Sequence, residues 1–426
     1  MALGVAGCSG LTSRTLNSEM PSVRSVDAYE LDLAIDRESH SVTGHEVIVL
    51  GGAAGTTISF PRHQIDIQAV TTTDGTRLEY AATDQLSIQI PIGTKSIAID
   101  YSVINPKGIA VTNNAIYSAF HTCHWMICLE SPSAKATFRI KLAVPAGWEM
   151  IASGRPTDDQ SQLPARTWDE QVPSAPYLFG FAIGDFSRTE RTRRGVAFEY
   201  WTLHRDPDWL NQIFADDDLM LDFFVEKAGM ELPRPYYRQV VVPGYEAQEM
   251  SSYSLLGDDY LNPRLTEPSE DWLIAHEMAH QFWGNLVSCT TWRDEWLTEG
   301  LVTFMVAAYK ERRWGRDAYD REMDLLERRA RAAAEANFDV PLNFAGAYPS
   351  LKLQRAITYD KAAVFLDKLR GKVGDDLFWR GIRIFTAQYA GRSATSDDFR
   401  GVFQSLSSPS DLSAFFEQYL VGGAGR

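Results

Sequence analysis

The sequence has little of what would place it outside the ordinary globular proteins. It contains only 4 cysteines in 426 residues, too few for a small disulfide-stapled scaffold. No stretch approaches the roughly 18 consecutive apolar residues of a membrane-spanning helix. Its 41 lysines and arginines face 56 aspartates and glutamates, and the net charge of −15, with no basic run, argues against nucleic acid as a partner. The length and the 45% hydrophobic content are typical of a globular protein with two or three domains.

The first residues contain one candidate targeting signal. Val5-Ala-Gly-Cys8 resembles the cleavage site of a bacterial lipoprotein, in which Cys8 would carry the lipid. A basic start and a longer apolar run, which such a signal also needs, are missing before it. An incidental cysteine in a small-residue tail over residues 1–25 is the alternative. The first interpretation predicts the bacterial cell envelope and the second predicts the cytoplasm, and the sequence leaves both open.

Residues 26–203 have the pattern of an antiparallel sheet domain. Residues 29–35, 86–90 and 136–144 alternate apolar with polar side chains, as half-buried strands do. Clusters of Gly, Pro, Asn and Asp separate these segments and supply the turns. We therefore expect a β-rich amino-terminal domain over this range.

Residues 204–426 are mainly helical by periodicity. Residues 208–229 predict a first helix, and 238–243 and 250–256 predict short strands. The remaining predicted helices span 270–286, 294–314, 317–336, 358–373, 375–389, 396–406 and 410–420. The sequence thus predicts an α+β fold, with a sheet domain followed by a mainly helical domain.

The most informative pattern is His-Glu-Met-Ala-His at residues 276–280. On a helix, His276 and His280 lie on one face and can bind one zinc ion. Glu277 follows the first histidine and is close enough to act as general base on a water molecule. The alternative is a core helix whose two histidines are buried and hydrogen-bonded.

A catalytic zinc takes three protein ligands and keeps one position open. The third candidate is Glu299 in Trp296-Leu-Thr-Glu-Gly, because the 18 residues between it and His280 accommodate two helices and a short connection. We expect Asp294 to cap the helix that carries Glu299. The composite pattern predicts one zinc ion per chain.

These motifs resemble those of the zinc aminopeptidases of the aminopeptidase N and leukotriene-hydrolase family. Residues 276–287 and 296–300 are similar to the family's zinc motif and have its spacing. Residues 359–365 resemble its Tyr-Glu-Lys-Gly block, and the β-rich part matches more loosely at 124–138 and 176–186. The resemblance implies a thermolysin-like catalytic domain.

The same resemblance suggests roles for two further kinds of residue. It implies that Tyr359 stabilises the tetrahedral oxyanion, a role that suits a neutral phenol donor; the alternative is a tyrosine packed at a helix start. Family exopeptidases hold the substrate's α-amine with the glutamate of Gly-Ala-Met-Glu-Asn. The corresponding segment here is Gly244-Tyr-Glu-Ala-Gln-Glu-Met, and the register that we favour makes Glu249 that glutamate.

Glu246 is the rival for the amine contact, and we expect it to point to the opposite face of the strand from Glu249. A second family contact, a Gln or Glu ten residues before the β-domain cysteine, falls on Ser118 here. Fewer residues therefore match the family's pattern for binding a free amino terminus than match its pattern for zinc hydrolysis.

The predicted function is a zinc metallopeptidase that removes amino-terminal residues from peptides with a free amino terminus. One alternative is a zinc endopeptidase with an open cleft. Another is a catalytically silent binding module, which should have lost Glu277 or a zinc ligand. Most relatives carry a large carboxy-terminal helical domain, so the resemblance implies a short two-domain member. The oligomeric state and the preferred amino-terminal residue stay open.

His121-Thr-Cys-His124, with Cys128 after it, superficially resembles a second metal site. Its spacing matches no standard zinc cluster, so we do not expect a second metal there. Whether Cys123 and Cys128 form a disulfide stays open. Cys289 is expected to be packed in the interior rather than reactive.

Overall fold

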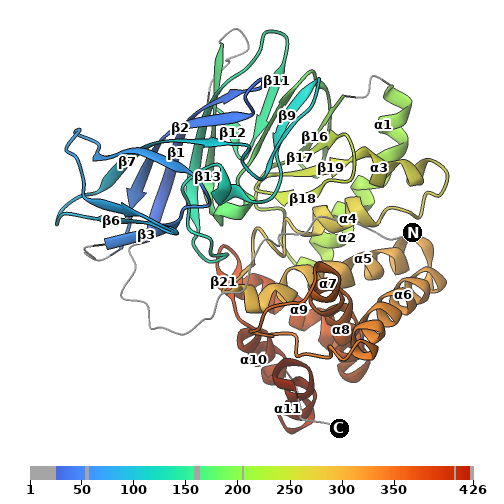
Figure 1. The fold of residues 1–426 in the computed structure, drawn as a ribbon. Helices are drawn as coiled ribbons and strands as arrows, with labels where there is room; N and C mark the ends of the chain where they lie inside the picture. Colours follow the sequence, from blue (N-terminus) through green and yellow to red (C-terminus); the bar gives the residue numbers. More distant parts are fainter. Residues whose placement is uncertain (1–24, 53–56, 158–163, 204–205, 407–408, 423–426) are drawn as a thin grey trace.

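The computed structural model describes residues 25–52, 57–157, 164–203, 206–406 and 409–422. Strands make up the first half and helices dominate the second half, whose helices from residue 299 onward lie below the sheets in Figure 1. This arrangement confirms the predicted α+β fold. In the part of the chain that is described, no helix is both long and apolar enough to cross a membrane. Cys8 lies outside the described residues.

The largest sheet has seven strands in the order β12-β13-β10-β1-β2-β7-β4. Its strands are β1 (Val26–Asp36), β2 (Ser41–Leu50), β4 (Asp66–Thr72), β7 (Ser96–Ile104), β10 (Ala136–Ala143), β12 (Arg155–Pro156) and β13 (Ala165–Ser174). In β1, Tyr29, Leu31 and Leu33 are buried while the residues between them are exposed, as the alternation predicted. The predicted antiparallel pairing is wrong at one place, because β1 and β10 run parallel.

Two smaller sheets complete the β-rich half. The four-stranded sheet, in the order β11-β14-β9-β8, contains β8 (Ile109–Val111), β9 (Ala115–Ser118), β11 (Glu149–Ala152) and β14 (Phe181–Gly184). The three-stranded sheet contains β3 (Thr57–Pro61), β5 (Tyr80–Ala82) and β6 (Gln85–Gln89). Short 3-10 turns, η1 (Thr122–His124) and η2 (Pro176–Leu178), connect the strands.

A five-stranded sheet joins the two halves, in the order β15-β16-β17-β19-β18. Its strands are β15 (Ser187–Arg193), β16 (Val196–Thr202), β17 (Tyr236–Val242), β18 (Ala247–Met250) and β19 (Tyr253–Gly257). Val240 and Val242 of β17 pack into the core of the β-rich half, whereas Tyr237 and Val241 pack into the core of the helical half. The sheet spans the predicted domain boundary at 203/204, and that boundary stays a prediction.

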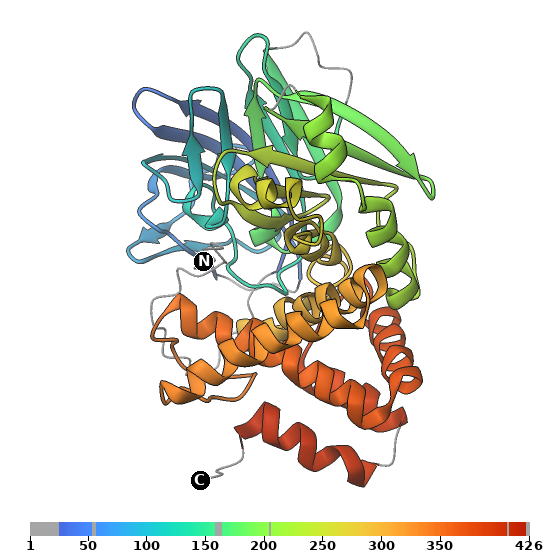
Figure 2. The ribbon, with the colours of Figure 1, turned by 90° about the vertical axis from the view of Figure 1, so that its right-hand side faces the viewer.

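The helices gather around one apolar core and are seen from a second side in Figure 2. The α-helices are α1 (Pro207–Ile213), α2 (Asp217–Ala228), α3 (Asp258–Leu261), α4 (Trp272–Ala279), α5 (Glu299–Trp314), α6 (Arg316–Glu335), α7 (Leu351–Arg355), α8 (Ala362–Val373), α9 (Asp375–Tyr389), α10 (Ser396–Leu406) and α11 (Pro409–Phe416). Shorter elements are η3 (Asn262–Leu265), η4 (Trp292–Leu297), the π-helical η5 (Ala356–Lys361) and η6 (Glu417–Gly422), β20 (Ser288–Cys289) and β21 (Ser393–Ala394).

Three predicted helices differ from the structure. The helix predicted over 208–229 is two helices, α1 and α2, and the one predicted over 270–286 ends at Ala279. The helix predicted over 294–314 begins only at Glu299, after the 3-10 turn η4.

The predicted capping by Asp294 is wrong. The Asp294 carboxylate accepts hydrogen bonds from the backbone N–H and the hydroxyl of Ser396, at 2.9 and 2.7 Å. It also accepts one from the Thr291 hydroxyl. Asp294 therefore ties η4 to α10 instead of capping α5.

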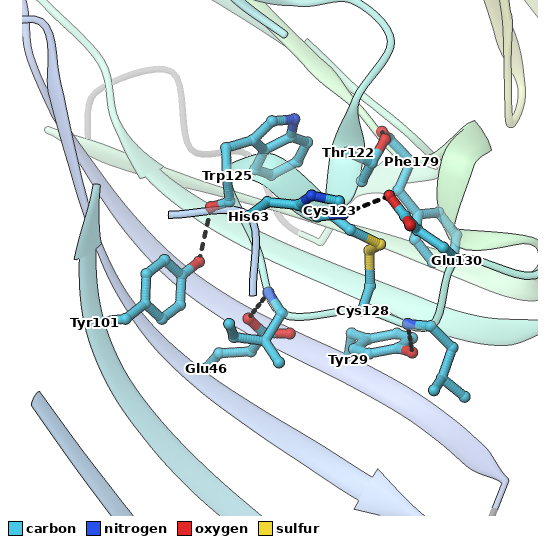
Figure 3. The surroundings of a disulfide bond; sticks show 12 residues. Tyr29, Glu46, His63, Tyr101, Thr122, Cys123, Trp125, Cys128, Glu130 and Phe179 are labelled. Atoms are coloured by element: carbon cyan, nitrogen blue, oxygen red, sulfur yellow. Dashed lines mark hydrogen bonds and ion pairs between the residues drawn. A yellow bond between two sulfur atoms is a disulfide. The ribbon is translucent and has the colours of Figure 1, made fainter. Parts of the chain in front are cut away.

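A disulfide joins Cys123 and Cys128, whose Cα atoms lie 5.2 Å apart, and Figure 3 shows its surroundings. The large sheet holds the enclosed segment from the side of β2 and β7. There, Glu46 accepts a hydrogen bond from the Ile127 N–H at 2.8 Å, and the Tyr101 hydroxyl donates to the Trp125 carbonyl at 2.9 Å.

Glu46 makes stability depend on pH, because burial raises the pKa of its carboxyl group to about 8. Folding then takes up a proton between the unfolded pKa of roughly 4.3 and that value. The stability that the neutral carboxyl contributes is therefore complete below this interval and is lost as pH rises through it.

We expect Glu46→Gln, which keeps an acceptor for Ile127 but carries no charge, to flatten the dependence of Tm on pH between about 5 and 8. At the alkaline end the variant should be the more stable protein, by on the order of a few kcal/mol. Glu30→Gln, at an exposed position of β1, is the matched control and should follow the unmodified protein. Parallel Tm profiles for Glu46→Gln and the unmodified protein would contradict this account.

Candidate active site

The three residues predicted to bind zinc lie side by side in the structure. The Nε2 atoms of His276 and His280, one α4 turn apart, are separated by 3.1 Å. The Glu299 Oε2 atom at the start of α5 lies 3.4 Å from His276 Nε2 and 3.3 Å from His280 Nε2. All three side chains are buried, and their ligand-capable atoms lie within 4.8 Å of one another. This spacing suits a single metal ion.

A hydrogen bond at Nδ1, the ring nitrogen that does not face Glu299, orients the ring of His280. Its Nδ1 atom lies 3.0 Å from the Trp283 carbonyl oxygen, which can only accept a hydrogen bond. In the neutral ring Nδ1 therefore carries the proton, and the lone pair of Nε2 faces Glu299. Gly284 follows with φ +145, and a Cβ there would lie 2.9 Å from His280 Nδ1. This position requires glycine.

Tyr359 reaches the site because two helices approach closely. It lies on the π-helical η5, a type of helix that is frequent at functional sites. A Cβ on Gly300, directly after Glu299, would lie 2.9 Å from the Thr358 carbonyl oxygen of η5 and 2.2 Å from the Cβ of Ala362, the first residue of α8, so glycine lets α5 approach η5 and the start of α8. The Tyr359 ring is nearly parallel to the His276 ring, with centroids 6.1 Å apart. Burial raises the pKa of Tyr359 well above its usual value, so its hydroxyl remains a donor at neutral pH.

Two further carboxylates lie beside the histidines. The carboxylates of Glu249, on β18, and Glu277, on α4, have ligand-capable atoms within 4.8 Å of each other and of His280. Burial raises the pKa of Glu249 to about 7 and that of Glu277 well above its usual range. Burial lowers the pKa of His280, but Glu299 and Glu249 outweigh it and raise that pKa to about 10. The carboxylates thus strongly favour a positive charge at this position.

Two buried oxygens make the site incomplete without a cation. Glu277 Oε2 is inaccessible to solvent and has no hydrogen-bond partner among the described residues, and the buried Glu299 Oε2 has the two histidine Nε2 atoms as neighbours at 3.4 and 3.3 Å. Burying carboxyl oxygens that lack a full set of partners costs free energy. A divalent ion held by two imidazoles and a carboxylate would compensate for that cost, so the residues fit the predicted zinc.

Of the two candidate amine-binding glutamates, only Glu249 is next to the histidines. Its neighbour Gln248 points toward the β-rich half, where its side chain accepts from the Phe120 N–H at 2.5 Å and donates to the Tyr177 carbonyl at 3.1 Å. The alternation of β18 then directs Glu249 toward the zinc-binding residues. Glu246 lies before β18 rather than in it, so the expectation of a strand residue on its opposite face is wrong.

Ser118, at the position of the second family contact, makes its hydrogen bonds within the sheet. Its hydroxyl accepts from the Phe181 N–H at 2.9 Å and donates to the Phe181 carbonyl at 3.3 Å.

Two charged residues near the site, Glu295 and Arg355, were not predicted from the sequence. Burial raises the pKa of Glu295 to about 8, and Gln354 Nε2 donates to its carboxyl group at 2.9 Å. The Nε and Nη2 atoms of Arg355 are buried with no hydrogen-bond partner among the described residues, and its charge acts on Tyr359 and Glu295. The available signal was the four-residue spacing of Arg355 and Tyr359, which brings both to one face of a helix.

Comparison with known proteins finds a peptidase domain and aminopeptidase relatives. Residues 214–419 match the sequence profile described as the peptidase family M1 domain. Glutamyl aminopeptidase from Rattus norvegicus is 23% identical over 288 residues, which cover 64% of this chain and 30% of the relative. Aminopeptidase N from Haemonchus contortus is 23% identical over 320 residues, covering 71% of this chain and 32% of the relative. The chain thus spans about a third of the length of these curated relatives.

The solved structure of native yeast LTA4 hydrolase has the same fold. It superimposes with a TM-score of 0.80 over 93% of this chain and 68% of that one, at 18% sequence identity. At this identity the likeness concerns the fold alone. It includes the succession of a sheet-rich half and a helical half.

The proposed division between ligand and neighbour can be tested by zinc content. We expect Glu299→Ala, which removes a ligand, to bind one zinc ion per chain fewer than the unmodified protein after equilibrium dialysis. Glu277→Gln should keep the full zinc content, because Glu277 is next to the ion without binding it. Elemental analysis that finds the loss in Glu277→Gln instead would assign the ion to Glu249, Glu277 and His280.

Proposed function

We propose that this chain is a member of the peptidase M1 family and a zinc-dependent aminopeptidase that acts on peptides with a free amino terminus. The observation that carries the proposal is the buried group of two histidines and three carboxylates formed by His276, Glu277, His280, Glu299 and Glu249. Such a group contains a ligand set, a base and an anchor for an ammonium ion. One zinc ion is proposed for this site, bound by His276, His280 and Glu299.

The attack on the peptide bond needs a base beside the metal. When bound, zinc supplies a Lewis acid that lowers the pKa of water and polarises a carbonyl group. Glu277, within 4.8 Å of His280, takes a proton from the attacking water and passes it to the leaving amine. It follows His276 directly on α4 and so lies beside the histidine pair.

Tyr359 and Glu249 act on opposite ends of the substrate's first residue. The Tyr359 hydroxyl, neutral because burial raises its pKa, donates a hydrogen bond to the developing oxyanion. Glu249 accepts hydrogen bonds from the α-ammonium group. A buried carboxylate discriminates against blocked amino termini, because without the ammonium partner its desolvation is uncompensated.

The direct test of this function compares aminoacyl anilides with free and acetylated amino groups. The zinc-loaded protein should hydrolyse the free substrates, lose this activity on chelation and regain it with zinc. Glu277→Gln should be inactive at full zinc content. A zinc-loaded protein that hydrolyses neither substrate class would contradict peptidase function and leave the silent binding module as the interpretation.

We expect Tyr359→Phe to lower kcat far more than it changes KM, because the lost hydrogen bond is made mainly in the transition state. Loss of one oxyanion donor typically costs about 10²–10³ in rate. Steady-state kinetics on a free aminoacyl anilide measure the two constants. Tyr309→Phe removes a buried hydroxyl elsewhere in the helical half and is the control. Near-normal turnover by folded, zinc-loaded Tyr359→Phe would make the tyrosine structural.

For the amine anchor, Glu249→Gln should reduce kcat/KM on free-amine substrates by about 10- to 150-fold, the equivalent of a charge-assisted hydrogen bond of about 1.5–3 kcal/mol. Acetylated substrates should be poor already and should not become worse. Glu246→Gln is the matched control and should change little. If free and acetylated peptides are cleaved equally, the enzyme is an endopeptidase, and a loss confined to Glu246→Gln would assign the amine contact to Glu246.

The disulfide bears on the compartment. Disulfides form and persist mainly in oxidising compartments such as the bacterial periplasm. The Cys123–Cys128 bond therefore favours the envelope over the cytoplasm, independently of Cys8. Cys289, the free cysteine among the described residues, is buried, which agrees with its expected packed position.

A further inference from the structure

A second group of metal-ligating side chains lies in the β-rich half. His63 follows β3, His124 ends η1, and Glu130 lies shortly after the disulfide. His63 Nε2 is 2.7 Å from the Glu130 carboxylate, and Figure 3 shows this pair beside the Cys123–Cys128 bond. The ligand-capable atoms of His63, His124 and Glu130 all lie within 4.8 Å of one another.

The histidine rings of this group lie close together. The rings of His63 and His124 are stacked, with centroids 3.9 Å apart and planes 15° from parallel. His121 meets His124 edge-on at 5.0 Å. Three imidazoles, a kind of ligand that zinc accepts, are therefore within reach of one another.

The backbone around the group is held in an uncommon conformation. His63 has φ 43 and His121 has φ 49, in the left-handed region that residues with a side chain rarely adopt. The disulfide closes the segment that follows His121, and Glu46 and Tyr101 bind it from the sheet. Such conformations persist where the surrounding structure imposes them, and they are common at binding sites.

We propose that His63, His124 and Glu130 bind a second zinc ion, with His121 as a further candidate ligand. Two imidazoles and one carboxylate are a donor set that zinc accepts. To point one nitrogen each at a common ion, the two stacked rings must turn. Both side chains are only partly buried, so they can turn without repacking the core.

This site differs from the one that the spacing suggested. Cys123 and Cys128 are joined to each other and are not available as ligands. The missing ligand comes from His63, far upstream in the sequence. With a second ion, the predicted content of one zinc per chain becomes two.

The site lies where the two halves of the chain meet. The Trp292 indole N–H donates to the Glu130 carbonyl at 3.3 Å, and the Trp292 ring contacts Tyr177 edge-on at 5.1 Å. Trp292 opens η4, which leads directly to Glu299. An ion bound by Glu130 therefore lies beside a contact between the β-rich half and the segment that carries a catalytic ligand.

Zinc stoichiometry tests this proposal on the full chain. After equilibrium dialysis against zinc, His63→Asn should contain one ion per chain fewer than the unmodified protein. Asparagine is chosen because it tolerates the left-handed backbone. His40→Asn is the matched control, since His40 is exposed, also has a positive φ of 49 and has no such group around it among the described residues. It should keep the full zinc content.

Glu130→Gln provides a second variant at an exposed side chain and should also lose one ion. Equal zinc content in His63→Asn, Glu130→Gln and the unmodified protein would overturn the proposal. The result does not depend on the active site: if His276, His280 and Glu299 bound no zinc, the same difference of one ion would remain. Glu299→Ala, in turn, should lose its own ion while keeping the ion at His63, His124 and Glu130.

Discussion

The structure depends most on the cost of burying several carboxylates together. Glu249, Glu277 and Glu299 converge on His280 inside the protein, and Glu277 Oε2 has no hydrogen-bond partner among the described residues. Like charges in a poorly solvated site repel one another, and the raised pKa values of Glu249 and His280 express the same demand for positive charge. A divalent cation meets that demand where a single proton meets it only in part. The proposed chemistry follows from the same groups. The carboxylates that favour a bound cation are also the groups proposed to transfer the proton and to bind the substrate's ammonium group.

Several elements of the fold hold these carboxylates and the neighbouring site residues in place. Residues of the five-stranded sheet pack into both cores, and its buried edge strand β18 brings Glu249 to the site. Gly300 allows η5 to pack against α5, and Tyr359 thereby reaches the ring of His276. Asp294 links η4 to α10 and holds the segment before Glu299. A site built in this way is organised before the substrate arrives, which is what electrostatic catalysis requires.

The sequence predicted what depends on local periodicity and short spacing. The α+β fold, most helices of the second half and the grouping of His276, His280 and Glu299 followed from such patterns. The rest depends on contacts between distant residues. The partner of Asp294 is Ser396, about a hundred residues later, and the direction of β18 is set by the bond of Gln248 to Phe120 in the other half. The proximity of His63 and His124 could not be predicted for the same reason, because no local pattern links residues so far apart.

The central claim is that the first zinc ion lies between His276, His280 and Glu299. Crystals of the zinc-loaded protein, measured with X-rays on either side of the zinc absorption edge, locate that ion directly by anomalous scattering. The account predicts a peak about 2.0–2.2 Å from the two Nε2 atoms and a Glu299 oxygen, with Glu249 and Glu277 close by but outside bonding distance. An empty position there in zinc-loaded crystals, or a peak bound by Glu249 and Glu277 instead, would contradict it.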